Sequence, residues 1–153
     1  MRARTLIALA GALLAWEAGV QAATYRLDDS ASQVIPPNAH WEWASGSLRT
    51  GTNTVHLNAR VIVRIDTRQW AGQAGRIYMV LPVDAGGRVT AQWESEGRLI
   101  PGRMLSGERT LVFSGTVPGP VLEDRLTVRL SADARTLVSD TQRFAFHFEL
   151  DTP

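Results

Sequence analysis

The sequence predicts an all-β fold, in which two antiparallel sheets of a single domain pack as a β-sandwich. Two observations predict it. Apolar and polar residues alternate along most of the chain after residue 22, which is typical of strands that bury one face. Turn-forming residues, chiefly Gly, Pro, Asp and Asn, interrupt this alternation at short intervals, and no segment there has the period of an amphipathic helix.

The first 22 residues have the features of a cleaved export signal. A short basic start, Met1–Arg4, precedes an apolar run from Thr5 to Trp16, and Val20–Ala22 fits the small-x-small cleavage pattern. The apolar run, roughly 12 residues, is too short to span a bilayer. We therefore expect residues 1–22 to be removed and residues 23–153 to form one domain without a transmembrane span. Its expected location is the periplasm, the cell surface or the extracellular space.

The charge and cysteine content exclude several classes of function. All 16 basic residues are arginine, against 15 acidic residues, and the chain has no Cys. Removal of Arg2, Arg4 and Glu17 leaves 14 arginines (16 − 2) and 14 acids (15 − 1), so the formal charge after residue 22 is zero. A nucleic-acid partner is not expected, because binding one requires a basic surface. Disulfides, thiolate metal sites and a Cys nucleophile are impossible.

The clearest predicted strand is Asn53–Asp66. Its apolar residues fall on one face: Val55, Leu57, Ala59, Val61, Val63 and Ile65. A helix would scatter these residues around its circumference. Because the strand is long, we expect a bend or a bulge within it.

Residues Arg76–Val83 predict a central strand, because both faces are apolar; Pro82 then lies at an end, an edge or a bulge. The Gly-rich connection that follows predicts a hairpin over Arg76–Glu94. The stretch Asp66–Trp93, with Ile77-Tyr78-Met79-Val80, resembles immunoglobulin-like modules of bacterial exported proteins. That resemblance implies a sandwich architecture and no site residues.

The remaining strands are shorter. We expect them at residues 24–27, 40–43, 98–104, 110–117, 126–132 and 143–150. Roughly seven to nine strands with these turns predict an immunoglobulin-like, antiparallel two-sheet β-sandwich, and a small closed barrel is the alternative.

The predicted C-terminal strand carries a hypothesis of assembly. Its residues Phe144, Phe146, Phe148 and Leu150 share one face. This strand resembles the terminal strands of bacterial pilus subunits, which are incomplete sandwiches completed by strand addition from a partner. The resemblance implies that these four residues take part in strand exchange with a protein partner. The alternative is an ordinary core strand that ends a complete sandwich.

Aromatic residues provide the candidate ligand site. Trp41 and Trp43 are expected on one face, either packed inward or exposed for stacking. Trp70 lies in a loop, where it either closes one end of the sandwich or stacks on a ligand. Trp93 alternates with apolar neighbours and is expected in the core. An exposed set of Trp41, Trp43 and Trp70 is typical of a site for a glycan or another small extracellular ligand.

We expect no catalytic residues, metal site or cofactor. Nucleophile motifs such as G-x-S-x-G are missing. A hydrolase that uses His40, His56 or His147 stays a minor alternative, as does metal binding by His56 and His147 if their strands are adjacent. Glu94 and Glu96 are interpreted as a solvated strand end. The acidic pairs 28–29 and 123–124 are interpreted as turn caps.

These expectations favour a non-enzymatic exported β-sandwich that acts by binding or assembly, as a surface or fimbria-associated component. A periplasmic module that binds a small molecule or a glycan through exposed Trp is the alternative.

Overall fold

The computed structural model describes residues 22–44, 52–83, 88–137, 141–142 and 144–153, and these residues confirm an all-β chain. The predicted signal peptide, apart from Ala22, lies outside them. None of the described residues forms a helix long and apolar enough to cross a bilayer. The strands are β1 (Thr24–Arg26), β2 (Gln33–Ile35), β3 (Ala39–His40), β4 (Glu42–Trp43), β5 (Thr54–Asp66), β6 (Ala74–Val80), β7 (Val89–Ser95), β8 (Gly102–Leu105), β9 (Arg109–Thr116), β10 (Val121–Asp133), β11 (Thr141–Gln142) and β12 (His147–Asp151). Two 3-10 turns, η1 (Arg68–Trp70) and η2 (Ala134–Thr136), complete the list.

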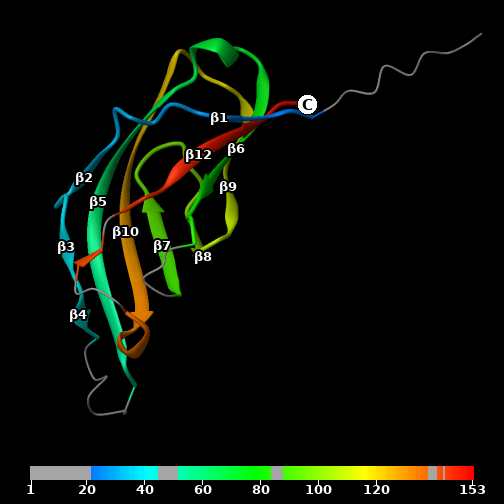
Figure 1. Ribbon diagram of the computed structural model, residues 1–153. Helices are drawn as coiled ribbons and strands as arrows, with labels where there is room; N and C mark the ends of the chain where they lie inside the picture. Colours follow the sequence, from blue (N-terminus) through cyan, green and yellow to red (C-terminus); the bar gives the residue numbers. More distant parts are fainter. Residues whose placement is uncertain (1–21, 45–51, 84–87, 138–140, 143) are drawn as a thin grey trace, which may run out of the picture.

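The strands form two antiparallel sheets, as predicted. Sheet A has the order β1-β12-β6-β9, and sheet B has the order β2-β5-β10-β7-β8, with β4 also beside β5. Strands β3 and β11 form a separate pair. Figure 1 shows β5 and β10 as two long strands side by side, with β12, β6 and β9 in a second layer. One continuous core joins the inward faces of both sheets.

The long strand β5 confirms the alternation read from the sequence. All six of its predicted inward residues are buried. Each of its 13 residues pairs with one of the 13 residues of β10, and the register has no shift. The bulge expected in this strand is therefore absent from its pairing with β10. Long uninterrupted pairing gives both strands the same inward face, and so they make the largest part of the core.

The predicted hairpin over Arg76–Glu94 is wrong. Strand β6 pairs with β12 and β9 in sheet A, whereas β7 pairs with β10 and β8 in sheet B. The chain thus crosses from one sheet to the other after β6, and Gly residues suit such a crossing as well as a hairpin. The central residues of the crossing, 84–87, lie outside the described part of the chain.

Strand β6 is central in its sheet, as predicted, but only one of its faces is covered. Ile77 and Met79 point inward and are buried, whereas Tyr78 and Val80 on the outer face are half-buried. The guanidinium of Arg109 lies 3.6 Å from the centre of the Tyr78 ring. The Arg109 side chain thus covers part of the outer face of β6, where the sequence predicted a second layer.

The structure has more strands than the seven to nine predicted, since twelve are present in the described residues alone. The difference arises mainly between residues 24 and 43, where four short strands replace the two expected. Pro36 and Pro37 separate β2 from β3. Because proline has no N–H to donate, a continuous strand beside β5 is interrupted at that point.

Candidate functional site

A cavity of about 270 Å³ lies between the two sheets. Eight apolar side chains make up most of its wall, and three polar residues lie at its rim. The apolar residues are Val34, Val61, Met79, Leu126, Val128, Phe144, Phe146 and Phe148, and the polar ones are Asp29, Ser30 and Ser32. Close packing usually leaves few voids of this size in a core, so this cavity is the candidate functional site.

Strand alternation explains how the wall forms. Val61 on β5 and Val128 on β10 point inward from sheet B, and Met79 on β6 and Phe148 on β12 point inward from sheet A. Because consecutive side chains of a strand point to opposite faces, only alternate residues reach the cavity. The same pattern that buries the core therefore produces the apolar walls.

The C-terminal segment contributes three of the four residues predicted for assembly. Phe144, Phe146 and Phe148 line the cavity. Leu150 is buried in the core but does not line the cavity. The rings of Phe144 and Phe146 are half-buried, with centroids 5.9 Å apart and planes tilted by 46°. The predicted grouping of these side chains on one side is thus confirmed for the three phenylalanines.

The predicted strand over residues 143–150 is too long at its start. Strand β12 begins at His147, which pairs with Val80, the last residue of β6. The described residues just before His147 consequently have no partner on β6, since β6 ends at Val80. Phe144 and Phe146 lie in this unpaired approach, and residue 143 is outside the described residues.

Strand β12 is an interior strand of sheet A. It pairs with β1 on one side, through Thr24–Arg26, and with β6 on the other. Both rows of its backbone hydrogen-bonding groups are therefore occupied within the chain. Exchange of β12 itself would require it to leave two neighbours, so an incoming strand fits an edge of the sheets better.

The rim of the cavity comes from the segment that crosses from sheet A to sheet B. Leu27 still donates its amide to the Phe148 carbonyl, and Asp28 forms a bridge with Asp66 on β5. Farther along, Ser32 Oγ accepts the Arg64 amide at 2.9 Å. These contacts attach the crossing segment to both sheets and place Asp29 at the opening.

The acidic pair 28–29 divides between two roles. Asp28 accepts the Ser30 amide at 3.0 Å, which confirms the turn cap expected there. Asp29 instead lies on the cavity rim. Burial is the largest influence on the Asp29 carboxyl and raises its pKa, against the opposing effects of its own amide, Arg26 and His147. Sequence reasoning missed Asp29, because a capping role explained both residues equally well.

The tryptophans do not form a shared stacking surface. Trp41 is half-buried and packs against the core, as does Trp70, whose ring lies 5.5 Å from that of Tyr25. Trp43 is 51% exposed. Trp93 is buried, as predicted, and its Nε1 donates to the Ile100 carbonyl at 2.9 Å. Of the three candidate residues, only Trp43 offers an open ring face.

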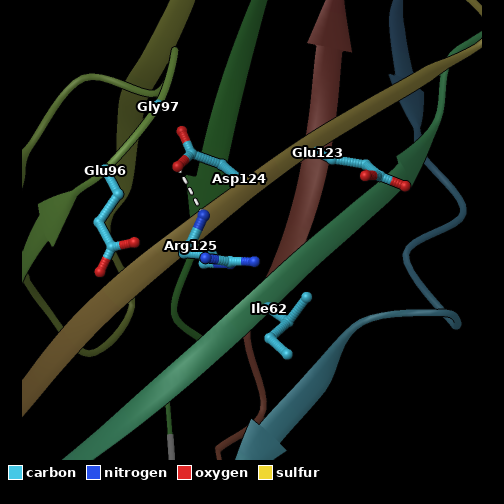
Figure 2. A pocket seen from close by; sticks show the side chains of 6 residues that line it. All are labelled: Ile62, Glu96, Gly97, Glu123, Asp124 and Arg125. Atoms are coloured by element: carbon cyan, nitrogen blue, oxygen red, sulfur yellow. Dashed lines mark hydrogen bonds between the residues drawn. The ribbon is translucent and has the colours of Figure 1, made fainter.

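A polar hollow of about 350 Å³ lies at the opposite end of the β5–β10 pair from β4. Figure 2 shows its three carboxylates, Glu96, Glu123 and Asp124, pointing in different directions. Glu123 pairs with Arg64 at 2.8 Å. Asp124 is buried and accepts hydrogen bonds from the Leu99 amide and Ser95 Oγ. The interpretation of 123–124 as a turn cap is wrong, because both residues lie within β10.

The three histidines lie on three different strands, none of which belongs to the same sheet as another. His56 is on β5 in sheet B, and His147 is on β12 in sheet A, each alternating with buried residues. The two strands are not neighbours, so the condition for a shared metal site is not met. His40 is exposed on β3. In the part of the chain that the structure describes, no three His, Asp or Glu side chains converge as metal ligands.

Neither a comparison with family models nor a comparison with curated proteins finds a match for this chain.

Proposed function

We propose that this chain is a non-enzymatic exported β-sandwich of immunoglobulin-like type that acts by binding or assembly. The observation that supports this proposal is the cavity between the sheets, lined by eight apolar side chains and opening at Asp29. An apolar cavity with a polar rim is the usual form of a binding site for a compact apolar group.

Export is part of the proposal. Strand β1 begins at Thr24, two residues after the expected cleavage site. Removal of residues 1–22 would therefore leave every described strand intact. The test is to produce the full-length chain in a bacterium and to sequence the N-terminus of the periplasmic product. We expect Ala23 as the first residue, and an unprocessed chain in the cytoplasm would contradict export.

In the assembly version of the proposal, the apolar group belongs to a strand of a partner subunit. Strand β5 favours this version, because the described strands on its side away from β10 are two separate short ones, β2 at residues 60–62 and β4 at residues 55–56, with single contacts of Asp28 and Ser32 beyond β2. Exposed edges of this kind accept strands from other chains. A synthetic peptide of residues 24–35 and the elution volume of the purified protein test this version. A monomer without affinity for the peptide would remove the pilus-like role.

Binding at the cavity has its own test with a matched pair of variants. 1-Naphthylamine, a small probe that is uncharged at neutral pH and fluoresces in apolar surroundings, is titrated into the protein. Val34→Trp narrows the cavity from its wall, whereas Ile35→Trp places the same indole ring at the 50% exposed neighbour on the opposite face. We expect saturable binding by the parent and by Ile35→Trp and at least tenfold weaker binding by Val34→Trp. Equal binding by all three would refute the cavity as the site.

A further inference from the structure

We propose that the cavity between the sheets binds a small amphiphile, with an apolar body among the phenylalanines and a hydroxyl or amine head at Asp29. This inference rests on the proposed function, since it names the ligand of the same cavity. The proposed occupant is a small molecule, and the test below also detects the case in which a partner's strand occupies the cavity.

The walls determine the body of the ligand. Side chains from both sheets and from the segment before β12 surround the space, and none of these eight carries a hydrogen-bonding group other than the Met79 thioether. An apolar cavity of about 150 Å³ accommodates a benzene ring, so a space of about 270 Å³ has room for roughly ten carbon atoms in the same proportion. A straight alkyl chain of eight to ten carbons is therefore of suitable size.

The rim determines the head. Ser32 Oγ is already hydrogen-bonded to the Arg64 backbone, at 2.9 Å to the amide and 3.3 Å to the carbonyl. Ser30 is bonded to Asp28 through both its amide and its side chain. Among the described residues, no side chain donates a hydrogen bond to the Asp29 carboxylate. Asp29 is thus the rim group that has an acceptor to offer.

The partial burial of Asp29 makes it selective. A half-buried carboxylate has lost part of its hydration, and a donor head restores a hydrogen bond that water no longer supplies fully. A hydroxyl or an ammonium can donate to it. A ligand carboxylate offers only acceptors at neutral pH and meets a like charge. The rim accordingly favours alcohols and amines over fatty acids of the same length.

The experiment compares three ligands that share one tail: octan-1-ol, octylamine and octanoate. Each displaces 1-naphthylamine from the protein at pH 7.5. We expect the alcohol and the amine to bind at least about tenfold more tightly than octanoate, the effect of one hydrogen bond to a charged group. Compared with octan-1-ol, decan-1-ol should bind about fourfold more tightly for each added methylene.

Two variants assign the head preference to one side chain. Asp29→Asn should reduce the difference between alcohol and octanoate to about threefold or less, because the repelling charge is gone. Asp28→Asn removes the same charge one residue away and keeps an oxygen for the Ser30 amide, so the preference should persist.

The outcomes separate this inference from the proposed function. If the probe binds but the three heads do not differ, or octanoate binds best, the assignment of Asp29 fails and binding at the cavity stands. If the probe is displaced only by the peptide of residues 24–35, the occupant is a strand, and the amphiphile is refuted. If the probe does not bind the parent protein at all, the proposed cavity site itself fails.

Discussion

Asp124 provides the most discriminating test of what holds the loop between β7 and β8, which contains Leu99. Its neighbour Glu123 points to the other face of β10 and therefore serves as a control on the same strand. Asp124 is 6% exposed. Its carboxylate accepts the Ser95 hydroxyl at 2.9 Å and the buried Leu99 amide at 2.7 Å. Asp124→Ala removes Oδ2, which accepts both of these hydrogen bonds, and leaves the Leu99 amide without a partner inside the protein, which costs more than the loss of an exposed contact.

The size of the effect follows from these two hydrogen bonds. Each bond to a charged acceptor contributes about 1.5–3 kcal/mol, so Asp124→Ala is expected to lower the free energy of unfolding by about 3–6 kcal/mol. With a urea dependence of about 2 kcal/mol/M, the unfolding midpoint falls by about 1.5–3 M. Asp124→Asn, which keeps one acceptor oxygen, should fall between the parent and Asp124→Ala.

Glu123→Ala is the matched control. Glu123 pairs with Arg64 at 2.8 Å, but both side chains are more than half exposed, at 59% and 51%. Such surface pairs contribute less than about 1 kcal/mol. Urea unfolding followed by circular dichroism measures both variants. Equal midpoints for Asp124→Ala and Glu123→Ala would refute the reasoning, because burial would then have no effect on how much a contact contributes to the free energy of unfolding.

Three further predictions test other parts of the structure. Arg109 donates to both oxygens of Asp151, at 2.6 and 3.0 Å, and this hydrogen bonding lowers the pKa of the Asp151 carboxyl. A depressed folded-state pKa contributes stability above the unfolded value of 3.8, and this contribution is lost as the pH falls through the folded pKa. Asp151→Asn should therefore flatten the acid side of a plot of urea midpoint against pH, and an unchanged slope would contradict the contact. Quenching of Trp fluorescence by iodide should decrease more in Trp43→Phe than in Trp93→Phe, because the Trp43 side chain is 51% exposed and that of Trp93 is 1% exposed. An equal decrease in both variants would mean that Trp43 is covered. Gly107→Ala should lower the unfolding midpoint in urea, because Gly107 has φ of +91° and an added Cβ would lie 2.9 Å from Val83 Cγ2; an unchanged midpoint would argue against this turn geometry.

Local alternation was enough to predict the sheet faces. Along β5 and β10 the apolar residues recur at every second position, and burial then decides which face points inward. The long strand β5, the inward face of residues 126–132, the burial of Trp93 and the grouping of Phe144, Phe146 and Phe148 could therefore be predicted from the sequence, whereas the first residues of β10 could not.

Pairing between strands could not be predicted in the same way. The Gly-rich connection after β6 permits either a hairpin or a crossing to the other sheet, and only long-range packing decides between them. The start of β12 depends on where its partner β6 ends, which is a property of the pairing and not of residues 143–146.

The cavity is likewise a property of two sheets together. Its wall takes one or two residues from each of β2, β5, β6, β10 and β12, and each of them looks like an ordinary core position in its own strand. Asp29 was explained as a turn residue, because its place at the opening depends on the crossing of residues 27–32 between the sheets. Only the three-dimensional arrangement separates it from Asp28.

The measurement that tests the central claim most directly is an isotope-filtered NMR experiment on the protein with bound octan-1-ol. Nuclear Overhauser effects should join the ligand's methylene protons to the Met79 methyl group and to the methyl groups of Val61 and Val128, because these three side chains line the cavity from both sheets. Contacts confined to surface methyl groups such as those of Val121, which is 40% exposed, would contradict a binding site between the sheets.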